Sequence, residues 1–195
     1  MKPKRSVRGE YVGYNWLDYL GSNSGSSTRD VEIEEGDRRD MSINRDQLRG
    51  LITDVLREAD LYSPSAVELL LLTASVESNL GEYIEQITGP AQGIFQMEPR
   101  TEDDIWENYL KFKPQLEAVV RGFCGNSVNP ELDLRGNLPY QIIMARVHYL
   151  RVPEPLPPAH DVAQLATYWK EHYNTHLGAG TVSKAIKKYK EYVDG

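Results

Sequence analysis

The stretch AVELLLLTASVESNLGEYIEQITGPAQGIFQMEPRT, residues 66–101, is the one around which the rest of the chain is organised. Its first half is apolar around nearly the whole circumference of a helix, which predicts a central, buried helix rather than a surface one. Ser63 and Pro64 mark the start of that helix as N-cap and first helical residue, and Gly81 marks its end. The second half is punctuated by glycine and proline and is expected to be an irregular loop.

Glu77 is the carboxylate near the end of this apolar run. Burial against the apolar wall disfavours the charged form, and so do the free carbonyls of the last helical turn. Both effects favour a protonated Glu77 near neutral pH, which is the state that a general acid needs. The alternative is a glutamate that points to water from a helix end, since glutamate is seldom buried without a partner.

Three motifs follow one another along the chain. Glu77-Ser78 comes first, then Gly89-Pro90-Ala91-Gln92-Gly93-Ile94-Phe95-Gln96-Met97-Glu98-Pro99-Arg100-Thr101, then Tyr173-Asn174 with Gly178 and Gly180 after it. In this order they resemble the Glu-Ser pair, the Gly-rich Gln-x-x-Pro-x-Thr segment and the Tyr-Asn of lytic transglycosylases and lysozyme-like peptidoglycan hydrolases. The resemblance spans about residues 45 to 190.

The resemblance implies a mainly α, lysozyme-like domain with little strand. It implies cleavage of the β-1,4 bond between N-acetylmuramic acid and N-acetylglucosamine in peptidoglycan, with Glu77 as the only acid and base and no cofactor. Ser78 and Tyr173 would orient Glu77, the latter through its hydroxyl, with Tyr168 as the competing candidate. The expected glycan-contacting residues are the Gly93 backbone, Ile94, Phe95, Gln96 and Asn174, although the apolar Ile94 and Phe95 are more typical of a core.

Two other classes of function stay open. A muramidase that uses water needs a second carboxylate across the cleft, for which Glu82, Glu85 and Asp103 are the candidates. A binding or structural protein keeps the fold without the activity. Glu82 and Glu85 are read first as solvated charges beside the cleft.

Helical spacing of apolar residues and helix-start signals predict the remaining elements. Helices are expected over residues 44–59, 101–110, 114–123, 139–151, 161–173 and from 181 to near the end, and a loop over 124–138.

Composition excludes several classes of protein. The net charge of −7 argues against a nucleic-acid partner, because phosphate binding needs a basic face. A single cysteine, Cys124, excludes a framework of intrachain disulfides and a cysteine-rich zinc site, and neither His148 nor His160 has a partner at metal-ligand spacing. The sequence carries no signal peptide and no apolar run long enough to span a membrane.

Residues 1–41 differ in character from the domain expected over 42–195. They combine a basic start, a Gly/Ser linker and a charged run with the aromatic segment YVGYNWLDYL, which contains Tyr11, Tyr14, Trp16 and Tyr19. An aromatic cluster on a tether is typical of an anchor that docks on a partner, and a tail that folds back on its own domain is the alternative. An acidic wall-cleaving domain on such an arm fits a bacteriophage particle, in which the arm would bind other virion proteins.

Overall fold

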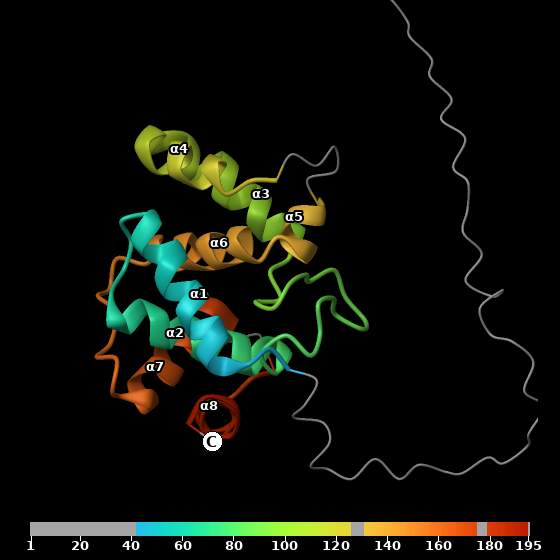
Figure 1. The fold of residues 1–195 in the computed structure, drawn as a ribbon, viewed down its shortest axis with the longest axis vertical. Helices are drawn as coiled ribbons and strands as arrows, with labels where there is room; N and C mark the ends of the chain where they lie inside the picture. The colour runs from blue at the N-terminus through green and yellow to red at the C-terminus, as the bar shows by residue number, and fades with distance from the viewer. Residues whose placement is uncertain (1–41, 126–130, 175–178, 195) are drawn as a thin grey trace, which may run out of the picture. The chain divides into compact units, whose positions relative to one another are not determined.

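The computed structural model describes residues 42–125, 131–174 and 179–194 (Figure 1). The described chain is mainly helical with almost no strand, as the sequence predicts. Its helices are α1 (Arg45–Glu58), α2 (Pro64–Ser78), α3 (Pro99–Asn108), α4 (Pro114–Gly122), α5 (Glu131–Gly136), α6 (Leu138–Leu150), α7 (Val162–Trp169) and α8 (Val182–Tyr189). A 3-10 turn (Leu110–Phe112) follows α3, and π-helical turns follow α7 (Lys170–Asn174) and α8 (Lys190–Asp194).

Helix α2 is the central element, as its apolar circumference predicts. Every residue from 69 to 75 is buried, and α2 packs against α1, α6, α7 and α8. Ser63 caps its start by accepting the Ala66 N–H. Because α2 is enclosed by its neighbours, the residues of its last turn lie in the interior of the domain.

The helix end differs in detail from the predicted glycine stop. Asn79 at φ 54°, Leu80 at φ 55° and Gly81 at φ 87° are all left-handed, so the reversal begins two residues before the glycine. Leu80 is nevertheless buried, and its N–H donates to the Ala74 carbonyl at 3.0 Å. This turn sends the chain into the loop of residues 82–98.

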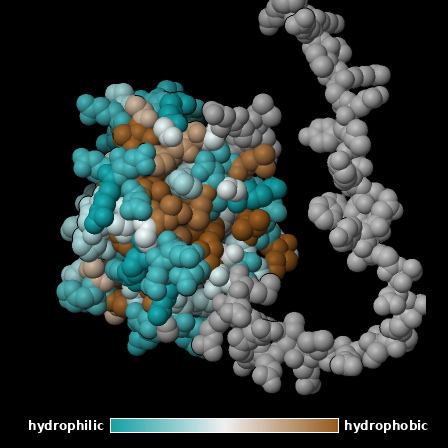
Figure 2. All heavy atoms as spheres, viewed as in Figure 1, coloured by the Kyte–Doolittle hydropathy of each residue, from teal (hydrophilic) through white to brown (hydrophobic). Residues whose placement is uncertain are grey.

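That loop is irregular, with two isolated antiparallel bridges, Glu85 with Gln92 and Gln92 with Met97. Figure 2 shows apolar side chains on the side of the molecule where this loop lies, and Tyr83, Ile84 and Ile87 are its exposed large hydrophobic residues. The loop therefore presents a partly apolar surface instead of a polar one.

Three predicted boundaries were wrong. Helix α3 begins at Pro99 with Glu98 at the N-cap, not at Thr101. The expected loop 124–138 contains the short helix α5. The predicted helix 161–173 ends at Trp169 and continues as a π-helical turn, and such turns are frequent at functional sites.

Within the described ranges, no helix combines the length and apolarity needed to cross a membrane. The predicted arm over residues 1–41, with Tyr11, Tyr14, Trp16 and Tyr19, lies outside the described residues.

Candidate active site

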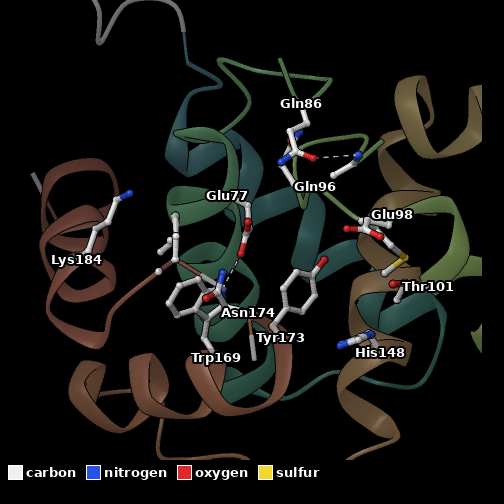
Figure 3. Close-up of a pocket in the computed structure, with 15 residues that line it drawn as sticks. Glu77, Gln86, Gln96, Glu98, Thr101, His148, Trp169, Tyr173, Asn174 and Lys184 are labelled. Carbon is white, nitrogen blue, oxygen red and sulfur yellow. Dashed lines mark hydrogen bonds between the residues drawn. The ribbon is translucent and has the colours of Figure 1, made fainter. Parts of the chain in front are cut away.

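A pocket of about 650 Å³ opens at the C-terminal end of α2. Its walls come from the end of α2, the loop 82–98, the start of α3, α6, the end of α7 with its π-helical turn, and α8. The polar residues lining it are Glu77, Gln86, Gln96, Glu98, Thr101, His148, Trp169, Tyr173, Asn174 and Lys184 (Figure 3). Segments far apart in the sequence thus converge on Glu77.

Glu77 lies on the wall of this pocket with its carboxyl largely buried, which argues against the alternative interpretation of a glutamate that points to bulk water. Burial raises the pKa of Glu77 to about 7, while the Trp169 hydrogen bond and the charge of Lys184 oppose that rise. The desolvation expected from the apolar run is therefore the main cause of the shift. Near neutral pH the carboxyl is close to half protonated, which suits a group that first gives and then accepts a proton.

Trp169 is the residue that holds Glu77. Its indole Nε1–H donates to Glu77 Oε1 at 3.0 Å, and the ring is completely buried at the end of α7. A Cβ on Gly180 would lie 2.5 Å from Trp169 Cη2, so glycine at 180 allows the following segment to pack on the indole. Because the indole can only donate, it fixes Oε1 as an acceptor and leaves Oε2 to carry the proton.

Ser78 joins the helix end to the loop and makes no hydrogen bond to Glu77. Its hydroxyl lies 2.6 Å from the Ile94 carbonyl oxygen and accepts the Gly81 N–H at 2.8 Å. The predicted orienting role is thus corrected: Ser78 positions the backbone opposite Glu77 and acts on the carboxyl only through the end of α2.

The resemblance predicts that the Gly93 backbone contacts the glycan. The structure gives a different reason why this position requires glycine. Its φ is +73°, and a Cβ there would lie 2.3 Å from the Leu134 carbonyl oxygen and 2.5 Å from Gln141 Oε1. Gln141 Oε1 also accepts the Ile94 N–H at 2.8 Å. Gly93 therefore lets the loop dock on α5 and α6, and its close neighbours are protein atoms.

The rest of the loop divides between core and pocket. Ile94 and Phe95 are buried, so the expectation that their side chains contact glycan was wrong and the core interpretation holds. Gln96 does line the pocket, at a left-handed φ of 46°. Its Nε2–H donates to the Gly93 carbonyl at 2.7 Å, which holds the side chain in place.

Tyr173 and Asn174 both line the pocket from the π-helical turn. The expected bond from the Tyr173 hydroxyl to Glu77 is replaced by one to the Phe95 carbonyl at 2.8 Å, so Tyr173 braces the loop facing the carboxyl. Asn174 Oδ1 accepts from Lys170 Nζ at 2.9 Å. Tyr168, the competing candidate, donates to the Glu154 carbonyl at 3.0 Å instead.

His148 completes the floor of the pocket beneath Tyr173. The two rings are 4.9 Å apart in an edge-to-face arrangement. Burial lowers the pKa of His148, so the ring is neutral at pH 7. Nε2 lies 3.0 Å from the His172 carbonyl oxygen and carries the hydrogen, while the buried Nδ1 has no hydrogen-bond partner among the described residues.

The carboxylates proposed as a second acid do not reach the site. Glu82, Glu85 and Asp103 are absent from the described pocket lining; Glu85 pairs with Arg135 at 2.8 Å. Glu98 lines the pocket instead, and its side chain makes no capping hydrogen bond to α3 although it occupies the N-cap. Sequence reasoning missed Glu98, Trp169 and Lys184 as pocket residues, because each fits an ordinary helix position.

No group of His, Cys, Asp or Glu side chains among the described residues is arranged to hold a metal ion. Comparison with protein-family models, with curated proteins and with solved structures found no match to this chain.

Proposed function

We propose that this protein is a lytic transglycosylase that cleaves the β-1,4 bond between N-acetylmuramic acid and N-acetylglucosamine in peptidoglycan, on a lysozyme-like domain. The observation that carries the proposal is Glu77, a carboxyl with a pKa of about 7 held by an indole N–H on the wall of a large polar pocket. The motif order Glu-Ser, Gly-Ile-Phe-Gln and Tyr-Asn supports the same reaction class.

The reaction needs one group that acts first as acid and then as base. Protonated Glu77 gives its proton to the bridging oxygen, and the bond from muramoyl C1 to that oxygen breaks with its electrons going to the oxygen. Ionised Glu77 then takes the proton of the muramoyl C6 hydroxyl while that oxygen bonds to C1. The products are a 1,6-anhydromuramoyl end and a new N-acetylglucosamine end, and no water is consumed.

The surrounding groups support each half of this cycle. The Trp169 N–H stabilises the carboxylate that forms after the first step, and it opposes the effect of burial on the pKa of Glu77. Gln96 offers amide donors and acceptors suited to sugar hydroxyl and N-acetyl groups, and Asn174 offers the same chemistry from the π-helical turn.

A hydrolytic muramidase is the second candidate, and Glu98 is the observation that favours it. Glu98 is a second carboxylate on the pocket wall, and Figure 3 places it on the opposite side of Glu77 from Lys184. A carboxylate across a glycosidase cleft can activate water or bind C1 directly. In that reaction the products carry reducing ends.

Mass spectrometry of the muropeptides released from purified peptidoglycan separates the candidates. The proposal predicts 1,6-anhydro products, each lighter than the hydrolytic product by one water, from wild type and from Glu98→Gln. Reducing-end products that disappear in Glu98→Gln would assign the hydrolase. No release by wild type would favour a binding or structural protein.

We also propose that the protein is carried in a bacteriophage particle and opens the cell wall during DNA entry. The support is the sequence of residues 1–41, whose aromatic segment with Tyr11, Tyr14, Trp16 and Tyr19 on a Gly/Ser linker suits docking on other virion proteins. Immunoblots of purified particles test this: the protein should be in the particles, and its presence only in cleared infected-cell lysate would contradict the proposal.

A further inference from the structure

Lys184 is the one lysine or arginine among the described residues that line the pocket. It extends from α8 on one side of Glu77 (Figure 3). In the part of the chain that the structure describes, no carboxylate lies within 4.0 Å of its ammonium group. The pocket therefore contains a cation whose charge is not neutralised by a close ion pair.

The other lysines of the C-terminal region have different surroundings. Lys188 Nζ donates to Asn79 Oδ1 at 2.8 Å and lies 4.8 Å from the centre of the Tyr192 ring, so it ties α8 to the end of α2. Lys187, on the same helix, is exposed like Lys184 but is not part of the pocket lining. Among the lysines that the structure describes, Lys184 is the one that lines the pocket.

If the substrate were neutral, a cation beside Glu77 would only disfavour the protonated carboxyl that begins the reaction. Its charge lowers the pKa of Glu77 and so depletes the acid form that begins the reaction. The sugar rings of a glycan strand are uncharged, and a neutral polar residue would bind them without this penalty. A lysine is favoured when the substrate itself brings a negative charge close to the scissile bond.

Peptidoglycan brings that charge on its peptide stems. Each muramic acid carries a stem through its lactyl group, next to the bond that is cut, and the stems bear free carboxylates. Resting on the proposed function, we propose that Lys184 binds a stem carboxylate and makes the enzyme select stem-bearing strands over strands stripped of peptide. The chain as a whole carries a charge of −7, so a local cation is needed to hold an anionic strand in this pocket.

The test measures binding and cleavage on two substrates, intact glycan strands and the same strands stripped of stems by an amidase. Binding is measured in the Glu77→Gln background, with Lys184→Met, Lys184→Arg and the matched control Lys187→Met. Lys184→Met should weaken binding to intact strands by about 3- to 10-fold, as expected for one charge-assisted contact that is partly exposed. It should leave binding to stripped strands unchanged, Lys184→Arg should retain most of the preference, and Lys187→Met should behave as the parent.

In the protein that retains Glu77, Lys184→Met should raise KM on intact strands more than it lowers kcat. Equal losses on both substrates, or a preference for intact strands that survives Lys184→Met, would overturn the assignment while leaving the proposed function standing. Failure of the otherwise wild-type protein to cleave either substrate would instead overturn the proposed function, on which this inference rests.

Discussion

Replacing Glu77 by glutamine should stabilise the protein in alkaline solution and change little in acid. The pKa of Glu77 is raised by burial from an ordinary 4.5 to about 7. A folded-state pKa above the unfolded value means that the folded protein binds the proton more tightly. The stability contributed by this proton is fully present below about pH 4.5 and is lost as the pH rises through 7.

The magnitude follows from the interval between those two pKa values. At about 1.4 kcal/mol per pH unit, the ionised carboxylate costs about 3 kcal/mol of folding free energy at pH 8, and less than about 1 kcal/mol at pH 5. Glutamine cannot ionise, and its Oε1 can still accept the Trp169 N–H. The free-energy gain of Glu77→Gln over wild type should therefore be about 2 kcal/mol larger at pH 8 than at pH 5.

Urea denaturation followed by intrinsic tryptophan fluorescence, at pH 5 and pH 8, measures this difference. Glu58→Gln serves as the control, because Glu58 is exposed at the end of α1 and should change stability by less than about 0.5 kcal/mol at either pH. The same increment for Glu77→Gln at both pH values would refute the claim that Glu77 is a desolvated acid.

Three further predictions follow from the site and its supporting loop. Because the acid form of Glu77 starts the reaction, kcat/KM should be level below pH 7 and fall about tenfold per unit above it; a profile flat to pH 9 would assign the proton to another group. Trp169→Phe removes the N–H that lowers the pKa of Glu77, so the alkaline limb should move to higher pH while kcat falls on the order of 10-fold; an unmoved limb would show that the bond does not act on Glu77. Gly93→Ala should cost at least about 2 kcal/mol of unfolding free energy, because its Cβ would meet Leu134 and Gln141 at a positive φ. Gly50→Ala in α1, where a Cβ meets nothing within 4 Å, should be neutral or stabilising; equal losses in the two alanine variants would contradict this reasoning.

The parts of the fold that could be predicted from the sequence are those set by local spacing. The apolar circumference of α2 predicts its burial, and it places Glu77 at the end of a buried helix, where desolvation is expected. The N-cap at Ser63 was likewise predicted by short-range signals and is made as expected, and Asn44 and Thr181 cap the two helices that were expected to begin at residues 44 and 181.

The parts that could not be predicted depend on which distant segments meet. Trp169 lies 92 residues from Glu77, and a tryptophan at helical spacing is normally a core residue. Its ring is indeed buried, and only the tertiary structure shows that its N–H reaches a carboxylate. Tyr173 lies in the π-helical turn after α7 and donates to the Phe95 carbonyl, 78 residues away in the sequence, a partner that local spacing does not specify.

The measurement that tests the central claim most directly is the initial rate of dye release from labelled, purified peptidoglycan at pH 6 by wild type, Glu77→Gln and Glu58→Gln. General acid–base catalysis contributes about 100- to 10,000-fold, so Glu77→Gln should lose at least about 100-fold of the rate while Glu58→Gln keeps the rate of wild type. A Glu77→Gln protein that is folded and retains the rate within about threefold would contradict the assignment of Glu77 as the catalytic group.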